Sequence, residues 1–410
     1  MAHTELILIN ISGPDKTGIT ASLTEILARY EADILDIGQA DIHHTLALGI
    51  LIKTDSNRSG EILKELLFKT NDLQVQVQFS IVSEEEYEAW VSRQGKNRYI
   101  VTLLGRKIKA AQISAVARII NEQGLNIETI TRLTGRMPLD EGKQPLTKGC
   151  IELSVRGTPE DKIKMQSDFM QLAAELDFDI SMQEDTMYRR ARRLICFDMD
   201  STLIRTEVID ELADRAGVGE QVRAITESAM RGEIDFRQSF TERVRLLKGL
   251  DVSVMKDIAE NLPITEGVGR MMDVLKRSGF KTAILSGGFT YFGEYLKQKF
   301  GFDYVYANEL EIGPDGKLTG NYVGDVVDGP RKKELLRLLA QVERIDIAQT
   351  IAVGDGANDL PMLAEAGLGI AFHAKPKVKA EASQSISTIG IDGVLYFLGF
   401  KDSYIDESTN

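Results

Sequence analysis

The sequence predicts an α/β chain: two small βαββαβ units, then a doubly wound parallel-sheet domain that carries a small helical cap. The order of strand-like and helical segments in residues 1–84 repeats in residues 97–185. Residues 193–410 contain apolar strand-like runs that end in polar residues, and a helical stretch at about 205–270 interrupts them. Because 410 residues are too many for one ordinary core, two or three domains are expected from the length, and the pattern of segments predicts three with these boundaries.

Composition and charge are typical of a soluble globular protein. The chain is 43% hydrophobic and 27% charged, and its formal net charge of −13 disfavours general binding of nucleic acid. No apolar run approaches the roughly 20 residues that a membrane span needs. The first residues lack the pattern of a secretory signal, so a cytoplasmic location without membrane partners is expected. Cys150 and Cys196 lie beside apolar residues and are expected to be buried thiols.

The first repeat begins with a strand at residues 5–12, and a turn containing Gly and Pro follows. A helix with its apolar residues on one face then runs to Tyr30. Two strand-like runs, a helix around residues 62–68 and a strand at 73–82 complete the order. The charged segment 83–96 is expected to be a linker with a short helix.

The second repeat has the same order of elements. Strands are predicted at residues 99–104, 125–133, 149–155 and 178–182, with helices at 110–123 and 161–176. A βαββαβ unit of this size is a ferredoxin-like sheet with its helices on one face. The following segment, 185–193, contains four arginines, which are typical of a solvated linker, although such a cluster could also contact another domain.

The two units resemble ACT domains, because each has glycines near its first strand–helix turn: Gly13 and Gly18 in one, Gly105 and Gly124 in the other. The resemblance implies that paired copies bind an amino acid, such as L-serine, and regulate the attached enzyme in a homodimer. By this resemblance Asp15, Gly18 and Gly105 lie nearest the effector groove. The alternative is that the two units serve only in oligomerisation.

Asp198 and Asp200 follow the apolar run at residues 193–197. In doubly wound sheets the ligand crevice lies at the carboxyl ends of the strands. Two carboxylates this close can face one pocket where the backbone turns, and Mg²⁺, which prefers carboxylate oxygens, would make their proximity tolerable. One carboxylate could then attack phosphorus while the other moves protons.

Two further stretches contain groups that suit a phosphate. A strand at residues 282–286 ends in Ser286 and two glycines, so the Ser286 hydroxyl and the Gly287 N–H could donate to one phosphate oxygen. An ordinary strand-to-helix turn would explain the glycines but not the serine. Lys332 lies at the start of a predicted helix, where it can neutralise charge on a phosphoryl group or be merely solvated.

A fourth stretch, residues 350–359, places Asp355 directly after another buried strand, where a metal ligand belongs. Asn358 and Asp359 follow at the start of a helix, and either could cap it. Capping would not explain Asp355 or the glycines on each side of it.

Together the motifs DxDST, Ser-Gly-Gly, Lys and GDGxND resemble those of the haloacid dehalogenase-like superfamily, whose core is Rossmann-like. The resemblance covers about residues 193–400. It implies that Asp198 is the nucleophile and that Asp200 is first a general acid and then a general base. Asp198, the Asp200 backbone carbonyl and Asp355 would hold Mg²⁺, while the serine and the lysine would grip the phosphoryl group.

The cap resembles that of the phosphoserine phosphatase family. A zwitterion with a phosphate needs an anion for its ammonium and a cation for its carboxylate, and Arg can bind a carboxylate bidentately. By resemblance, Glu207 binds the amino group and Arg243 the carboxylate. Met230 and Phe236 form apolar walls, and Asn358 orients the phosphate or carboxylate side. Alternatively, the arginine lies on an ordinary helix surface and the two apolar residues belong to the cap core.

The resemblance implies hydrolysis of O-phospho-L-serine, the last step of serine biosynthesis, under amino-acid regulation. One alternative is a phosphatase or phosphotransferase for another small phosphomonoester, such as phosphohomoserine. A second alternative is a non-catalytic amino-acid sensor with a vestigial phosphatase domain. The complete set of four motifs argues against that sensor.

Overall fold

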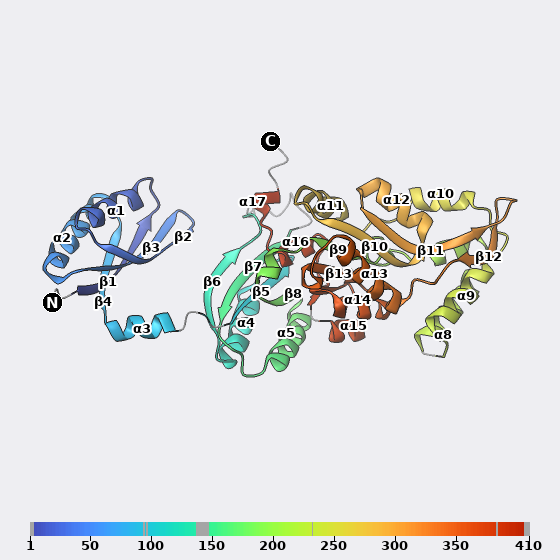
Figure 1. Ribbon diagram of the computed structural model, residues 1–410, viewed down its shortest axis with the longest axis horizontal. Coiled ribbons are helices and arrows are strands. Elements are labelled where there is room, and N and C mark those ends of the chain that lie inside the picture. Colours follow the sequence, from blue (N-terminus) through green and yellow to red (C-terminus); the bar gives the residue numbers. More distant parts are fainter. Residues whose placement is uncertain are drawn as a thin grey trace. The chain divides into compact units, whose positions relative to one another are not determined.

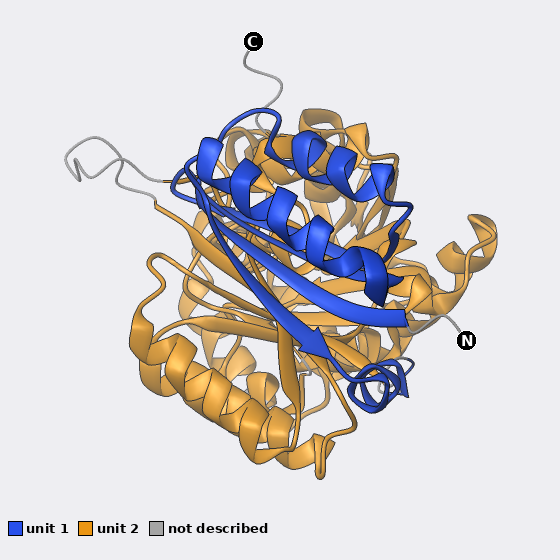
Figure 2. Ribbon diagram, turned by 90° about the vertical axis from the view of Figure 1, so that its left-hand side faces the viewer, with its two compact units in different colours: residues 1–96 blue, residues 97–410 orange. Residues whose placement is uncertain are grey.

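The computed structural model describes residues 4–92, 95, 97–136, 147–231, 233–382 and 384–405, without the side chains of Met230 and Lys377. The chain divides into two compact units, Met1–Lys96 and Asn97–Asn410 (Figure 2). No helix in these described ranges is long and apolar enough to cross a membrane.

The first unit is the predicted βαββαβ sheet. Its antiparallel strands lie in the order β2-β3-β1-β4, and its core is made of residues that β1, β3, α1 and α2 turn toward one another. Along β1, alternate residues face that core, while Asn10 and Ser12 between them are exposed. His43 and His44 form the two-residue turn between β2 and β3, both with positive φ. The elements are β1 (Thr4–Pro14), α1 (Ile19–Arg29), β2 (Asp33–Ile42), β3 (Thr45–Asp55), α2 (Ser56–Asp72), β4 (Gln76–Val82) and the linker helix α3 (Glu84–Ser92).

The second unit begins with another βαββαβ sheet, of order β6-β7-β5-β8 (Figure 1). The elements are β5 (Arg98–Gly105), α4 (Ala110–Glu122), β6 (Asn126–Arg132), β7 (Gly149–Arg156), α5 (Lys162–Leu176) and β8 (Asp179–Glu184). The arginine segment that follows includes the short helix α6 (Met187–Arg190), and two of its four arginines contact another domain, which is the alternative to a solvated linker. Arg189 and Arg192 are buried, the first paired with Glu152 at 2.7 Å and the second bonded to Gln183 at 2.8 Å. Both partners lie on the second sheet, so the arginines attach it to the segment that follows.

The rest of the second unit is a seven-stranded sheet of order β12-β11-β10-β9-β13-β14-β15, parallel except for β12. This confirms the predicted doubly wound core. Its strands are β9 (Leu194–Phe197), β10 (Lys281–Phe289), β11 (Tyr304–Ile312), β12 (Leu318–Val323), β13 (Thr350–Gly354), β14 (Leu368–Phe372) and β15 (Gln384–Ile386). Its helices are α11 (Val268–Arg277), α12 (Thr290–Phe300), α13 (Gly329–Val342), α14 (Leu360–Glu365), α15 (Pro376–Glu381), α16 (Gly393–Phe397) and α17 (Asp402–Ile405), with short turns η2 (Ile347–Gln349) and η3 (Ala357–Asp359).

A helical cap is inserted between β9 and α11 (Figure 1). It consists of α7 (Val208–Arg215), α8 (Gly219–Met230), α9 (Phe236–Leu246) and α10 (Ser253–Glu260). Where the chain enters and leaves the cap, Arg205 N–H donates to Pro263 O at 2.8 Å and Thr265 N–H to Leu203 O at 3.0 Å. The cap is therefore joined to the core by two chain segments that lie side by side.

Candidate active site

Three neighbouring parallel strands bring the predicted motifs to one edge of the sheet. β9 lies between β10 and β13, and Asp198 follows its last residue. The Asp198 N–H donates to Val353 O at 2.9 Å, which continues the pairing with β13. Ser286 lies near the end of β10, and Asp355 follows β13 directly. Because parallel strands end at the same edge, these residues from distant parts of the chain meet.

Lys332 connects two carboxylates in the interior of this site. It begins the second turn of α13 and is fully buried. Its Nζ lies 2.7 Å from Asp198 Oδ1 and 2.6 Å from Asp359 Oδ1. Burial alone would lower the pKa of Lys332, but Asp198 and Asp359 hold the pKa above its ordinary value, so the ammonium stays charged. Lys332 therefore brings a fixed positive charge to Asp198.

Asp359 caps the short turn η3, as its position in the sequence suggests, and it also pairs with Lys332. One of its oxygens pairs with Lys332, and the other accepts from the Gly356 N–H at 3.0 Å. The side chain also packs so closely on Gly354 that a Cβ there would lie 2.4 Å from Asp359 Cγ. A cap role could be proposed from sequence because Asp359 precedes a helix. Its contact with Lys332, however, depends on how β13 and α13 are placed in the fold.

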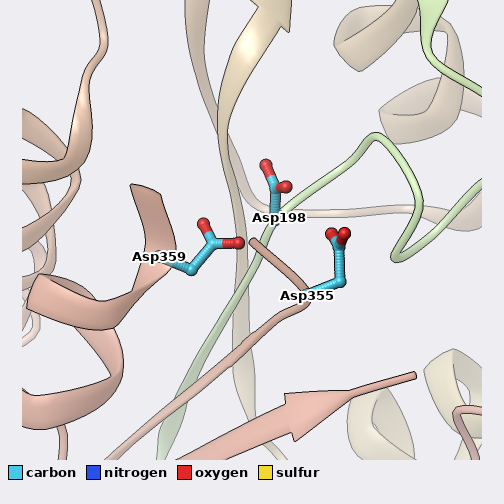
Figure 3. A group of neighbouring side chains, drawn as sticks. All are labelled: Asp198, Asp355 and Asp359. Atoms are coloured by element: carbon cyan, nitrogen blue, oxygen red, sulfur yellow. The ribbon is translucent and has the colours of Figure 1, made fainter. Parts of the chain in front are cut away.

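Asp198, Asp355 and Asp359 form a group of carboxylates that could hold a metal ion (Figure 3). One oxygen from each lies within 4.8 Å of the others. Desolvation, together with Asp359, raises the pKa of Asp198 to about 7, and desolvation, together with Asp198 and Asp359, raises that of Asp355 to about 8. Crowded carboxylates of this kind are stabilised by a bound cation, and an all-oxygen donor set fits Mg²⁺.

The Asp200 carboxylate lies outside this group and faces the cap. Its Oδ1 accepts from the Val208 N–H at 3.1 Å, at the start of α7. Its Oδ2 lies 2.3 Å from the place a Cβ on Gly288 would take, so only glycine leaves room for it. Desolvation, with Glu207 and Asp198 nearby, raises the pKa of Asp200 and favours its protonated form.

The irregular end of β10, which contains Ser286 and Gly287, is held by Asn308, a residue that belongs to none of the sequence motifs. Ser286 is fully buried, and its Oγ accepts from the Gly288 N–H at 2.9 Å. Asn308, on β11, donates from Nδ2 to Gly287 O at 2.8 Å and accepts at Oδ1 from the Val327 N–H at 2.8 Å. A single polar residue within a strand is a weak signal, so Asn308 could be found only from the structure.

Glu207 and Arg243, the predicted ligands of an amino acid, both lie in the cap. Glu207 precedes α7 and accepts from Ser201 Oγ at 2.7 Å. Arg243, on α9, has Nη1 3.4 Å from Thr226 Oγ1 and Nε 3.3 Å from Ser239 O, and no ion pair is found for it within the described residues. Desolvation lowers the pKa of Arg243, against the influence of Glu207, Asp210 and Asp200. A half-buried guanidinium without a paired carboxylate suits an anionic ligand.

The remaining predicted substrate residues are placed unequally. The Phe236 ring reaches Gly287, where its Cζ would lie 3.1 Å from a Cβ. Phe236 also stacks on Phe240, with ring centroids 6.2 Å apart. Asn358 lies in η3, with its side-chain oxygen against Gly356. Met230 ends α8, but its side chain lies outside the described residues.

The three predicted regulatory residues fall in different units. Asp15 and Gly18 are exposed in the first unit, where the Asp15 N–H donates to His44 O at 2.9 Å. Gly18 has φ 88° and precedes α1, which requires the left-handed conformation that glycine adopts readily. Gly105 ends β5 in the second unit and is buried. Their part in an effector groove stays a prediction.

Comparisons with known proteins agree with this arrangement. The models of ACT domains match residues 5–80 and 98–183, and that of haloacid dehalogenase-like hydrolases matches residues 192–367. The phosphoserine phosphatase of Streptomyces coelicolor is 38% identical over 396 residues, which are 96% of this chain and 92% of that protein. The phosphoserine phosphatase of Mycobacterium tuberculosis is also 38% identical, over 96% of this chain and 93% of its own.

Two solved structures have a similar fold. The unliganded crystal structure of a probable phosphoserine phosphatase from Vibrio cholerae has a TM-score of 0.58 and 36% identity, covering 75% of this chain and 87% of that one. A crystal structure of a hydrolase of the haloacid dehalogenase family from Salmonella enterica has a TM-score of 0.61 and 31% identity, covering 73% and 98%.

Proposed function

We propose that this chain, which belongs to the phosphoserine phosphatase family, hydrolyses O-phospho-L-serine to L-serine and inorganic phosphate. The observation that carries the proposal is the buried Lys332, 2.7 Å from Asp198 at the end of the central strand and next to Asp355 and Asp359. A lysine and several carboxylates at one strand edge suit the transfer of a phosphoryl group onto a carboxylate.

In the proposed reaction, Asp198 attacks the phosphorus, and the bond between phosphorus and the serine oxygen breaks. Asp200 donates its proton to that leaving oxygen, so that serine departs neutral at its hydroxyl. Asp200 then takes a proton from water, whose oxygen attacks the phosphoaspartate and releases phosphate and the Asp198 carboxylate. Lys332, Ser286 and the Gly287 N–H hold the phosphoryl oxygens in both steps.

Mg²⁺ is the proposed cofactor, held by Asp198, Asp355 and the Asp200 backbone carbonyl. When bound, it would stabilise the negative charge that develops on the phosphoryl oxygens. Asp359 is proposed as a supporting residue, because it binds Lys332 and one of its oxygens lies within 4.8 Å of an oxygen of Asp198 and of Asp355. The excess of carboxylates over ammonium groups in this interior supports the need for such a cation.

Selectivity for phosphoserine is proposed to come from the cap. Glu207 would bind the ammonium group and Arg243 the carboxylate, with Met230 and Phe236 as apolar walls and Asn358 orienting the phosphate side. Within the described residues no carboxylate forms an ion pair with the half-buried guanidinium of Arg243, whose hydrogen bonds go to Ser239 O and Thr226 Oγ1, and this supports the assignment. A substrate that lacks the amino group would leave the Glu207 carboxylate without its partner.

Regulation, assembly and location complete the proposal. The ACT domains would bind an amino acid such as L-serine near Asp15, Gly18 and Gly105, in a cytoplasmic homodimer that performs the last step of serine biosynthesis. The ACT matches to both repeats support regulation. The domain boundaries 1–84, 97–185 and 193–410 stay predictions.

The proposal is tested by the release of phosphate from phosphoserine. The purified protein should be active with Mg²⁺ and lose activity with a chelator, and Asp198→Asn should abolish turnover while circular dichroism stays unchanged. Full magnesium-dependent hydrolysis by Asp198→Asn would refute the covalent route. Repeating the assay with L-serine tests regulation in the same experiment.

A panel of phosphomonoesters separates phosphoserine from related substrates. We expect the highest kcat/KM for phosphoserine, with Arg243→Lys raising KM because an ammonium cannot bind a carboxylate bidentately. A preference for phosphohomoserine would reassign the substrate. No turnover of any phosphomonoester, together with binding of an amino acid, would instead favour a non-catalytic sensor.

A further inference from the structure

The side chains that would react with or bind the phosphoryl group of the substrate are almost completely buried. Asp198 and Asp200 are 5% and 8% exposed, and Lys332 is 0% exposed. Side chains this enclosed can meet a phosphomonoester only if the cap and core separate and close again. What holds the closed arrangement is therefore part of how the site works.

The cap is attached to the core unevenly. Backbone hydrogen bonds tie its two chain connections together, and others join residues 249–252 to β12 and the turn before it, such as Gly249 N–H to Leu318 O at 2.8 Å. The helix α9 is held differently. Within the described residues, its polar links to the core are made by side chains: Arg237 to Asp328 and Thr241 to Tyr322.

Arg237 forms the closer of these two links. Its Nε lies 2.7 Å from Asp328 Oδ2, whereas the hydroxyl oxygens of Thr241 and Tyr322 are 3.2 Å apart. The Asp328 side chain is only 11% exposed, but that of Arg237 is 61% exposed. An arginine that reaches from solvent to a nearly buried carboxylate can leave and return without leaving a buried cation behind.

The two ends of this ion pair are adjacent to functional groups. Arg237 follows Phe236, whose ring lies against Gly287 of β10, a proposed ligand of the phosphoryl group. Asp328 starts α13: its Oδ1 accepts from the Arg331 N–H at 3.0 Å, and its carbonyl accepts from the Lys332 N–H at 2.9 Å. The pair thus joins the apolar wall of the cap to the first turn of the helix that carries the lysine.

We propose that Arg237 is a positioning residue: by pairing with Asp328 it holds the start of α9 against the core and keeps the cap closed over the reaction centre. This inference rests on the proposed function, because closure matters only for a substrate that must enter. Among the described residues, the hydrogen-bond partner of the Arg237 side chain is Asp328 and not the nucleophile Asp198, so we assign Arg237 no catalytic role. It acts through Asp328 and through the place that it gives to Phe236.

The first test compares the kinetics of Arg237→Gln and the unaltered protein on phosphoserine. Because the Arg237 side of this pair is mostly exposed to solvent, the pair is expected to be weak. We therefore expect KM to rise about two- to fivefold with kcat nearly unchanged, since bound substrate still drives closure. Arg245→Gln is the matched control, because it removes an exposed arginine from the same helix, and its KM should not change. A fall in kcat with an unchanged KM would overturn the proposal.

Two further variants separate the ion pair from a purely structural effect. Arg237→Lys keeps the positive charge, so its KM should stay closer to that of the unaltered protein than to that of Arg237→Gln. Asp328→Asn keeps an oxygen that can cap α13 but removes the charge, so it should raise KM as Arg237→Gln does. The double variant should be no worse than either single variant, and additive effects would contradict a direct pair.

Hydrogen exchange without substrate tests the same contact independently of activity. In Arg237→Gln we expect faster exchange in residues 236–246 than in the unaltered protein, with no change in α11. Unchanged exchange in α9 would overturn the proposal even if the protein is a phosphoserine phosphatase. If the unaltered protein does not hydrolyse phosphoserine, the proposed function fails, and faster exchange would still establish the contact.

Discussion

The two βαββαβ domains have the same order of elements, but they differ in the sheet face that points away from their helices: it is exposed along the second half of β1 in the first domain and buried along β5 of the second. In β1 of the first domain, Ile7, Ile9 and Ile11 face the helices, while Asn10 and Ser12 on the other face are exposed. In β5 of the second domain that other face is buried as well: Ile100 is 4% exposed, and Thr102 and Leu104 are 0% exposed. Ser12 and Leu104 correspond, because each precedes the glycine that ends or bends its strand.

The covered face of the second domain belongs to the core of the phosphatase domain. Leu104, Leu133 and Cys150 join the large apolar cluster that includes residues of β9, the cap and α16. Asp179 accepts from the Ser387 N–H at 2.6 Å and from the Thr388 N–H at 3.0 Å. Within the second unit these two domains therefore share one interior.

The difference shows that fold alone does not decide how a domain is integrated. A strand with alternating apolar and polar residues, such as β1, buries its apolar side chains against the helices of its own domain. A strand that is apolar on both faces needs a second layer of structure to bury the other face. The first domain is consequently a unit of its own, and the second is a structural part of the enzyme.

The largest predicted effect comes from removing each domain. A chain that begins at Asn97 should stay soluble, unfold cooperatively and keep its basal phosphatase activity, because the first unit has a separate core. A chain that begins at Arg193 should aggregate or lose activity, because it exposes the apolar partners of Leu104 and Cys150. Thermal unfolding and phosphate release measure both. Equal behaviour of the two shortened chains would remove the distinction between the domains.

A single matched pair of substitutions sharpens the same contrast. Leu104→Ala should lower the free energy of unfolding of the second unit by about 2–5 kcal/mol, because it leaves a cavity in a shared core. Ser12→Ala at the corresponding exposed position should change stability by no more than about 0.5 kcal/mol. Urea unfolding followed by circular dichroism compares them, and a similar cost for both would contradict the comparison.

The difference in burial between the two strands can be predicted in part from the sequence. Residues 5–12 alternate toward their end, with Asn10 and Ser12 between isoleucines, whereas residues 99–104 are almost continuously apolar. That difference predicts that the second strand is buried on both faces. It does not identify the covering layer, because the partners of Leu104 lie almost 300 residues later in the chain.

The same limit applies to the candidate site. Asp198, Ser286, Lys332 and Asp355 could be found because each belongs to a motif next to a strand or helix. Asn308, which joins Gly287 of β10 to Val327 in the segment before α13, belongs to no such motif. Contacts of this kind depend on which strands are neighbours, and the order β11-β10-β9-β13 is not local information.

A smaller effect is expected from Gln384, which links β15 to β8. Its Oε1 accepts from the Met182 N–H at 3.0 Å and its Nε2 donates to Met182 O at 2.9 Å, so the side chain imitates a paired strand. Gln384→Leu removes both bonds and leaves the partly buried N–H and C=O of Met182 without these partners, which should cost about 1–2 kcal/mol. Differential scanning calorimetry measures the loss. Unchanged stability would mean that apolar contacts alone join the domains.

The smallest predicted effect concerns Arg106, whose Nη1 and Nη2 lie 3.0 and 2.7 Å from the two oxygens of Glu266, next to the chain segment that leaves the cap. Both side chains are about a third exposed, at 35% and 34%, so Arg106→Met should cost only about 0.5–1 kcal/mol at neutral pH.

The hydrogen bond from Arg106 lowers the pKa of Glu266 in the folded protein. The stabilisation is therefore complete above the ordinary Glu pKa of about 4.3 and is lost as the pH falls through the lower folded value. The free energies of unfolding of the unaltered protein and of Arg106→Met, measured between pH 7 and pH 3, should become equal at the acid end. In a Glu266→Gln background, Arg106→Met should cause no such pH-dependent difference. A difference that stays constant with pH would show that Arg106 contributes by packing and not by its charge.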